Sequence, residues 1–544
     1  MTAQRTRTNP WHILAVLCVA NFLILLDTTI VNAALPDVQR SLDAGIDEAL
    51  WVLNGYLLAF ASLLIVFGRL GDAIGPRRVF VAGLGLFTVA SALCGVAAGA
   101  DDLVWARVLQ GVGAAALLPQ ALVLITATFP AHRRGAAFGI FTAVAGVASV
   151  SGLVVGGVLV TELGWRSVFF LSVPVGVAGI VAALRLVPAV APARRHRLDP
   201  VGVLLATAGL SGVAYVLVEG PRHDWGTVTG LVSIPAVAAL AVVCLVLFVL
   251  WERRQPEPLL PMGLFRDRNF TIAVAIALVT YFALFGVLLV LTLQLQSMLG
   301  MSPAMAGVAG LPLVLALSAV APLAGRLTDR LGGRTLLVAG LAVYAVGVVM
   351  LALLPTTSST ALAFLLPLLV IGIGTGLTIA PSTAEAMGEI APNQAGAAAG
   401  VLNTARQVGA VLGTAVIGAV LQNRLTGALR VEASERVMGL PDPARAPYLL
   451  GFDTAAERGL QLGGSVAVPP DLSPSVAAQF TRLVHDAFGQ AFLAAGRPTL
   501  FVVAAVLLFG SALAALMPRP TPAPVVLPTP AEPVWRPHAP IPTR

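Results

Sequence analysis

The sequence contains no lysine, although it has 33 basic residues, so every one of them is arginine. The chain therefore has no P-loop lysine for a nucleotide, no Schiff-base lysine and no kinase-type lysine. This absence excludes a primary pump that the chain alone would drive with ATP.

Charge and cysteine are also scarce. Only 11% of the 544 residues are charged, while 58% are hydrophobic and the mean hydropathy is +0.91. A soluble protein of this size needs more charge to cover its surface. Cys18, Cys94 and Cys244 lie in apolar stretches without the spacing of a disulfide or metal site. We therefore expect a membrane protein that is not an enzyme, needs no cofactor or metal, and binds no nucleic acid.

Long apolar runs recur along the chain, and each is long enough to cross a hydrocarbon core of about 30 Å. The expected fold is an all-α membrane protein with fourteen transmembrane helices. The predicted spans are 12–35, 48–67, 78–99, 103–128, 136–160, 167–188, 200–219, 228–251, 271–294, 303–324, 335–354, 361–387, 397–420 and 498–517. The span over 200–219 is among the weaker ones.

Arginine placement predicts the orientation. With the N-terminus in the cytoplasm, 21 arginines fall in cytoplasmic segments, whereas the short outer loops hold only Arg40, Arg166 and Arg222. This bias is the one that the positive-inside rule requires. The outer loop 421–497 is long enough to be exempt from the rule, and we expect it to form a cap with an amphipathic segment over 474–495. The proline-rich tail is predicted to be disordered.

An eleven-residue motif occurs twice. "GRLGDAIGPRR" at 68–78 returns as "GRLTDRLGGRT" at 325–335, with six of eleven positions identical at an offset of 257 residues. Each copy lies between the second and third span of a six-span block, so the chain consists of two related halves, which is typical of transporters. The predicted division is an N-terminal half over 1–190, two inserted helices over 191–255, a C-terminal half over 256–520 that includes the loop 421–497, and a cytoplasmic tail over 521–544.

Both copies carry glycine, aspartate and arginine at matching positions. Gly68 and Gly75 permit tight turns and close backbone approach, and Asp72 can favour the N-terminus of a neighbouring helix. Arg77 and Arg78 would hold the loop at the lipid headgroups. The matching residues of the second copy are Gly325, Asp329 and Arg334. A basic turn that only sets topology is the alternative, but it does not explain the repeated glycine and aspartate.

Asp27 lies inside the first apolar span, in "NFLILLDTTIVNAALP" at 21–36. Helical rise places Asp27 about 13 Å, and Arg107 about 7 Å, below the same membrane surface. We therefore expect Arg107 to pair with Asp27, the alternative being that it only bonds backbone carbonyls. Burial disfavours an ionised carboxylate and a cation favours it, so such a site can change its protonation between two states. Asp27 is the predicted proton carrier.

A second polar cluster lies in "NTARQVG" at 403–409, where Arg406 is about 14 Å into its span by helical rise. Intramembrane charges face the bundle interior or a wet cavity by default. Asn403, Arg406 and Gln407, together with Asn32 of the first span, are predicted to line the substrate cavity. A structural anchoring role for Arg406 is equally compatible with the sequence.

Four motifs resemble those of the major facilitator superfamily, in particular its fourteen-span drug:proton antiporters. "LDTTIVNAALP" at 26–36 resembles the first-span motif, and "GRLGDAIGPRR" the cytoplasmic-loop motif. "RVLQGVGAA" at 107–115 and "GWRSVFFLSVPVG" at 164–176 resemble the motifs of the fourth and sixth spans. The resemblance implies that the loop motif latches one half to the other and loosens as the transporter changes state.

The fifth span departs from the antiporter pattern. It reads "GLVVGG" at 152–157, with Leu153 where the family motif has proline. The spacing of Gly152 and Gly156 permits close helix packing, next to Gly157.

The sequence thus predicts a bacterial cell-membrane exporter, with both termini cytoplasmic, that exchanges small lipophilic drugs or antibiotics for protons by alternating access as a monomer in the lipid bilayer. One alternative keeps the fold but makes the protein a metabolite importer or an uncoupled facilitator. Another is a receptor or scaffold whose long outer loop binds a partner, which fits the repeated motif poorly.

Overall fold

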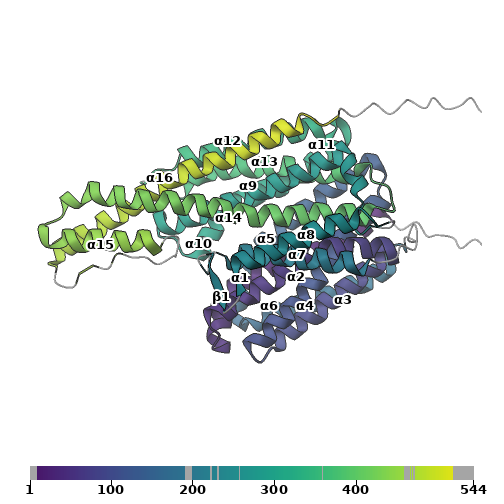
Figure 1. Cartoon of the computed structure of the whole chain (residues 1–544), viewed down its shortest axis with the longest axis horizontal. Coiled ribbons are helices and arrows are strands. Elements are labelled where there is room, and N and C mark those ends of the chain that lie inside the picture. The colour runs from purple at the N-terminus through teal and green to yellow at the C-terminus, as the bar shows by residue number, and fades with distance from the viewer. Residues whose placement is uncertain are drawn as a thin grey trace, which may run out of the picture.

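The computed structural model describes residues 9–189, 199–220, 223, 225–229, 232–255, 258–357, 359–458, 466, 468–469 and 472–518. This part of the chain is nearly all helical, and its long helices run side by side as a bundle (Figure 1). Thirteen of the described helices are long and apolar enough to span a membrane. The expected fold is confirmed, and the count of fourteen is approximate because the apolar part of α7 spans only Pro200–Val216.

The N-terminal half consists of six helices. They are α1 (Pro10–Leu42), α2 (Ile46–Ile74), α3 (Pro76–Val96), α4 (Ala100–Thr128), α5 (Ala131–Leu163) and α6 (Arg166–Leu186). Local signals set their ends: Asn9 caps α1 by accepting a hydrogen bond from the Trp11 amide at 3.1 Å, and proline occupies the first turn of α1 and of α3.

The C-terminal half repeats the arrangement. It comprises the short helix η2 (Met262–Arg266), α9 (Arg268–Leu299), α10 (Pro303–Ala309), α11 (Leu311–Leu331), α12 (Gly333–Leu353), α13 (Leu362–Gly388), α14 (Ala395–Arg436), η3 (Val437–Gly439), α15 (Asp442–Arg458) and α16 (Pro474–Ala514). Its last two long helices, α14 and α16, are longer than their counterparts. The predicted span 303–324 is divided, because α10 ends before Gly310 and α11 begins after it.

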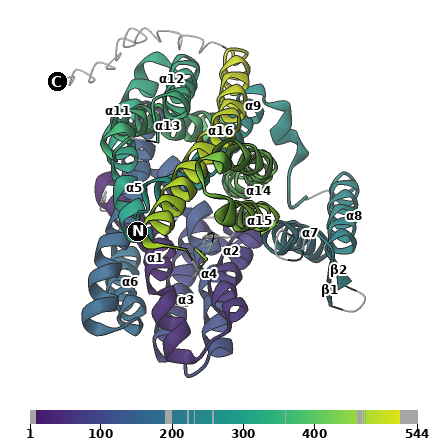
Figure 2. The same cartoon turned by 90° about the vertical axis from the view of Figure 1, so that its left-hand side faces the viewer.

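The inserted helices α7 (Pro200–Glu219) and α8 (Ile234–Glu252) lie at the side of the bundle (Figure 2). α7 packs against α2 of one half and α14 of the other. A short antiparallel hairpin, β1 (Thr227–Thr229) and β2 (Val232–Ser233), joins the two inserted helices. The predicted span 228–251 was therefore wrong at its start, where the chain forms this hairpin.

The segment after the predicted thirteenth span continues as helix. α14 has 42 residues, which at 1.5 Å per residue is about 63 Å, roughly twice the thickness of a hydrocarbon core. α14 and α16 project together beyond the bundle and carry α15 (Figure 1). Tyr448, Phe452 and Phe480 are buried between these helices, with ring centroids 4.8 and 5.4 Å from that of Tyr448.

The two halves meet along two helix pairs that are related by the repeat. α2 packs against α14, and α5 packs against α11. In each pair, one helix comes from the N-terminal half and the other from the C-terminal half. We call one end of the bundle the arginine-rich end. α1 and α5 begin there, and α2 and α11 finish there.

Candidate functional site

Asp27 and Arg107 meet in the interior of the N-terminal half, on α1 and α4. Nη1 of Arg107 donates a hydrogen bond to Oδ2 of Asp27 at 2.5 Å, and each residue is 1% exposed. Burying either charge alone would cost several kcal/mol. The two side chains therefore compensate each other in a place where neither could remain charged alone.

Gln110 completes this site and was missed by the sequence analysis. Its Nε2 donates to Oδ1 of Asp27 at 2.8 Å and to the Ser91 hydroxyl at 2.7 Å, while its Oε1 accepts from Arg107 at 2.6 Å. Both oxygens of Asp27 are thus bound. Gln110 follows Arg107 by three residues in "RVLQG", a spacing that places both side chains on one helix face and could have revealed it.

Arg107 also holds neighbouring helices. Its Nε donates to the carbonyl of Val52 on α2 at 3.1 Å, and its guanidinium carbon lies 4.3 Å from the centroid of the Tyr56 ring. An aromatic face attracts a desolvated cation. Arg107 therefore makes both of the contacts that the sequence left open. It pairs with Asp27, and it also bonds a backbone carbonyl.

Asp72 connects α2 to the other half at the arginine-rich end. Its carboxylate accepts hydrogen bonds from the amides of Gly396 at 2.8 Å and Ala397 at 3.1 Å, in the first turn of α14. A negative charge at a helix N-terminus contributes about 0.3–1 kcal/mol, and up to about 2 kcal/mol when partly buried. A methyl group on Gly68 would lie 2.3 Å from the Gly396 carbonyl oxygen, so this approach requires glycine.

Asp329 makes the matching contact in the opposite direction. On α11, it accepts hydrogen bonds from the amides of Gly135 at 2.8 Å and Ala136 at 3.0 Å, in the second turn of α5. A methyl group on Gly325 would lie 2.0 Å from the Gly135 carbonyl oxygen. Each half thus binds backbone amides in the first two turns of a helix of the other half, through the same motif residues.

The remaining motif residues act within their own halves. Gly75 ends α2 with φ of +102°, a conformation that favours glycine. Arg77 donates to the carbonyl of Leu184 near the end of α6, whereas Arg78 is exposed and Arg334 is half-buried in the first turn of α12. The contacts between halves therefore come from the aspartates and glycines rather than from Arg77.

Arg406 lies in a buried polar cluster of the C-terminal half. Its Nη1 donates to Oδ1 of Asn403 at 3.3 Å, its Nη2 donates to the Thr383 hydroxyl, and its guanidinium carbon lies 5.6 Å from the centroid of the Tyr281 ring. Within the described residues, no carboxylate pairs with Arg406 and its Nε has no hydrogen-bond partner. In contrast to Arg107, this buried cation is uncompensated.

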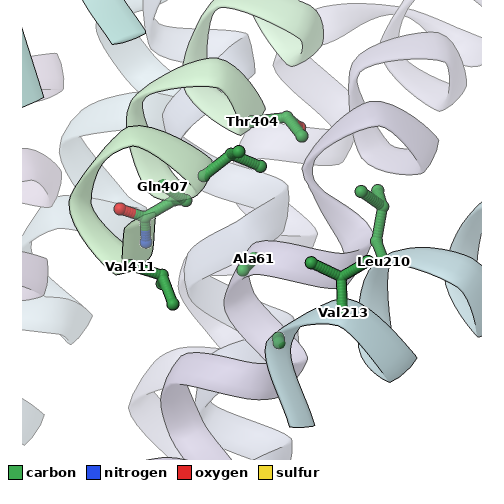
Figure 3. Close-up of a pocket in the computed structure, with 8 residues that line it drawn as sticks. Ala61, Leu210, Val213, Thr404, Gln407 and Val411 are labelled. Carbon is green, nitrogen blue, oxygen red and sulfur yellow. The ribbon is translucent and has the colours of Figure 1, made fainter. Parts of the chain in front are cut away.

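The other predicted cavity residues lie apart from Arg406. Gln407 faces a small pocket between α2, α7 and α14 (Figure 3). Asn32 on α1 is exposed and donates to the Thr28 carbonyl at 2.8 Å. Other residues that line the pocket are Ala61, Leu210, Val213, Thr404 and Val411. Its volume of about 30 Å³ is roughly that of one water molecule. Of the predicted set, the structure groups only Asn403 with Arg406.

The glycines of the fifth span bring α5 close to α1. A methyl group on Gly152 would lie 1.8 Å from the Thr29 hydroxyl oxygen, and one on Gly156 would lie 2.6 Å from a side-chain carbon of α1. Gly157 follows in the same helix, and α5 continues without interruption across Leu153. The contact is the close packing that a small residue at every fourth position permits.

Two six-helix halves with paired contacts and buried charges define a membrane transporter of the two-repeat type. The chain belongs to the Major Facilitator Superfamily, whose family model matches residues 17–414.

Curated relatives are named for resistance and export. The chain is 36% identical to the multidrug resistance protein Stp of Mycobacterium tuberculosis, over 82% of each chain. It is 34% identical to the tetracenomycin C resistance and export protein of Streptomyces glaucescens, over 93% of each chain. Its identity to the puromycin resistance protein of Streptomyces alboniger is 40%, over 75% of this chain and 81% of the relative.

Solved structures share the fold at low sequence identity. The human organic anion transporter MFSD10 aligns with a TM-score of 0.54 and 13% identity, over 92% of this chain and 99% of that one. The proton:xylose symporter XylE aligns with a TM-score of 0.52 and 16% identity, over 76% of this chain and 89% of that one.

We expect the Asp27–Arg107 pair to show strong coupling in a double-mutant cycle of stability. Arg107→Gln and Asp27→Asn should each lower the free energy of unfolding by about 3–5 kcal/mol, because each leaves one buried charge alone. The double variant should recover much of that loss, as measured by thermal unfolding in detergent. The exposed pair Asp37–Arg40 is the matched control and should contribute at most about 1 kcal/mol. Purely additive losses at 27 and 107 would contradict the pairing.

Asp329→Asn should loosen the contact between α5 and α11. Losing about 1–2 kcal/mol of charge-assisted hydrogen bonding would raise the population of the separated state roughly 5–30-fold. The measurement is the rate of maleimide labelling of Ser318→Cys, since Ser318 faces Gly146 across this interface. Asp453→Asn, at an exposed carboxylate of α15, should leave the rate unchanged. An unchanged rate in Asp329→Asn would show that the carboxylate does not hold the interface.

Proposed function

We propose that this protein exports small lipophilic drugs or antibiotics in exchange for protons. The observation that carries the proposal is the Asp27–Arg107 pair, a buried ionisable group whose charge balance changes when one proton binds. Such groups inside a membrane bundle mark proton and substrate pathways by default. The names of the resistance and export relatives support the direction and the substrate class.

Proton binding at Asp27 would switch the site in a defined way. A proton on Oδ2 neutralises the carboxylate and removes its attraction to Arg107, while Oδ1 can still accept the Gln110 amide hydrogen bond. Arg107 keeps the Val52 carbonyl and the Gln110 oxygen as acceptors. The protonated site therefore weakens the contact between α1 and α4 to the single hydrogen bond from Gln110, while Arg107 keeps two of its acceptors and loses the compensation of its charge.

The latches at the arginine-rich end supply the second element of alternating access. In this structure Asp72 and Asp329 join the two halves there, and the opposite state requires both contacts to separate. We assign this end to the cytoplasm from the arginine bias, so that both termini are cytoplasmic, and we propose that one chain forms the functional unit. The proposed units are residues 1–190, 191–255 and 256–520.

Asp27→Asn should abolish proton-driven export while leaving the chain folded. The amide keeps the size of the carboxylate but cannot take up a proton, so dye efflux driven by a pH gradient should fall at least about tenfold. The measurement is efflux from a pump-deficient host and from proteoliposomes, compared with Asp37→Asn on the same helix. Efflux that kept its size and pH dependence in Asp27→Asn would rule out this carboxylate as the proton carrier.

Arg406→Gln should weaken substrate binding if Arg406 lies in the substrate path. We expect KM for export to rise about tenfold, the equivalent of one lost charge-assisted hydrogen bond, with little change in thermal stability. Arg406→Lys should restore part of the affinity, and Arg424→Gln, at an exposed position on the same helix, should change nothing. A large loss of stability with unchanged KM would instead establish Arg406 as an anchor.

A further inference from the structure

A groove with a volume of about 870 Å³ lies at the arginine-rich end between the two halves. Its walls come from the start of α5 in one half and from the last three turns of α11 in the other. Trp11 on α1 and Leu377 on α13 complete it. The groove is adjacent to the Asp329 latch, and none of the functions assigned above uses it.

Four basic side chains line this groove. They are His132 and Arg133 on α5 and Arg326 and Arg330 on α11. All four are exposed, and within the described residues none of them forms an ion pair with a carboxylate. Asp329 also lines the groove, but its oxygens already accept two amides of the second turn of α5. The groove therefore presents uncompensated positive charge from both halves.

The deeper part of the groove is apolar. Leu323 and Leu327 are 61% and 39% exposed on the same face of α11 as Arg326 and Arg330. Val320, the deepest lining residue of this helix, lies about 15 Å along the axis from Arg330 by helical rise. Leu327 lies between Arg330 and Arg326 along α11, whereas beyond Arg326 the lining residues of this helix are the apolar Ala324, Leu323 and Val320. Both arginines therefore lie in the outer part of the wall and the inner part is apolar, in the order in which a phospholipid presents its headgroup and tails.

We propose that this groove binds an anionic phospholipid, whose headgroup contacts the basic side chains of α5 and α11 together and whose acyl chains cover Leu323 and Val320. Basic pockets between transmembrane helices on the cytoplasmic side bind anionic headgroups. Because the lipid touches both halves beside Asp329, it favours the arrangement in which this end is closed. The bilayer thereby influences the conformational equilibrium independently of what the protein transports.

Charge complementarity favours a phospholipid over two other possible occupants of the groove, a lipophilic substrate and a free anion. A cationic lipophilic substrate would be repelled by three arginines, and a neutral one would leave them uncompensated. A free anion such as phosphate would satisfy the charges but leave the apolar wall without a partner. A phospholipid with a negative headgroup satisfies both parts of the groove.

The test measures binding of labelled phosphatidylglycerol and phosphatidylcholine, with identical acyl chains, to the purified full-length protein. Phosphatidylglycerol should bind at least about tenfold more tightly, and Arg326→Gln/Arg330→Gln should remove that preference. Arg253→Gln/Arg254→Gln is the matched control, because it removes two exposed arginines from the end of α8. Arg326→Lys/Arg330→Lys keeps the charge and should keep the preference, which separates charge from misfolding.

Nanodiscs supply the conformational readout. Maleimide labelling of Ser318→Cys should be slower in phosphatidylglycerol than in phosphatidylcholine, and the difference should vanish in Arg326→Gln/Arg330→Gln. Equal binding of both lipids, or an equal loss in the Arg253/Arg254 control, would overturn the proposal. Complete displacement of phosphatidylglycerol by millimolar inorganic phosphate would also overturn it, in favour of a free-anion site. Efflux driven by Asp27 is not part of either measurement, so the two proposals can fail separately.

Discussion

A charge placed in a hydrocarbon layer has no water to solvate it, so it must be compensated inside the protein. Most of this structure can be understood from how each intramembrane charge meets that demand. Asp27 and Arg107 compensate each other, and Gln110, Ser91 and the Val52 carbonyl bind the remaining donors and acceptors. Such a network holds α1, α2, α3 and α4 together, so the contacts among these four helices include the charge of one carboxylate.

The need to compensate charge also explains the two contacts that Asp72 and Asp329 make between the halves. Asp72 and Asp329 are carboxylates near the membrane surface that accept hydrogen bonds from backbone amides near the start of α14 and of α5. Arg69 also lies 3.9 Å from Asp72. Amides at a helix N-terminus are fixed in direction, so the contact needs close approach of two backbones, which glycine provides. A contact made of short hydrogen bonds between rigid helices is formed or broken as a unit, which suits a protein that alternates between two states.

Much of this could be read from the sequence because helix spacing and repeats are local properties. The repeated motif predicted two related halves, and helical rise placed Asp27 and Arg107 at compatible depths. The partners of Asp72 and Asp329 could not be predicted, because Gly396 and Gly135 lie near the starts of helices that are distant in sequence, and neither residue carries a charge. Gln407 was expected beside Arg406, but consecutive residues on a helix face different neighbours, and α7 covers the face of Gln407. The hairpin before α8 was missed because its short strands follow an apolar pattern that continues into the helix.

The two halves are equivalent at the arginine-rich end and different in the interior. The N-terminal half contains a compensated pair, whereas the C-terminal half contains Arg406 with only neutral hydrogen-bond partners and the Tyr281 ring among the described residues. Proton binding at Asp27 would add one positive charge to the interior, and Arg406 already contributes another. The bundle would then hold two uncompensated cations, a state that is costly in a membrane. That free-energy cost opposes protonation of Asp27 while the interior is closed to water. The cost falls when the interior opens to water, or when a substrate binds that offers hydrogen-bond acceptors to Arg406. Under the proposed function, charge balance alone would therefore link proton binding at Asp27 to the occupancy of the other half, without any direct contact between Asp27 and Arg406.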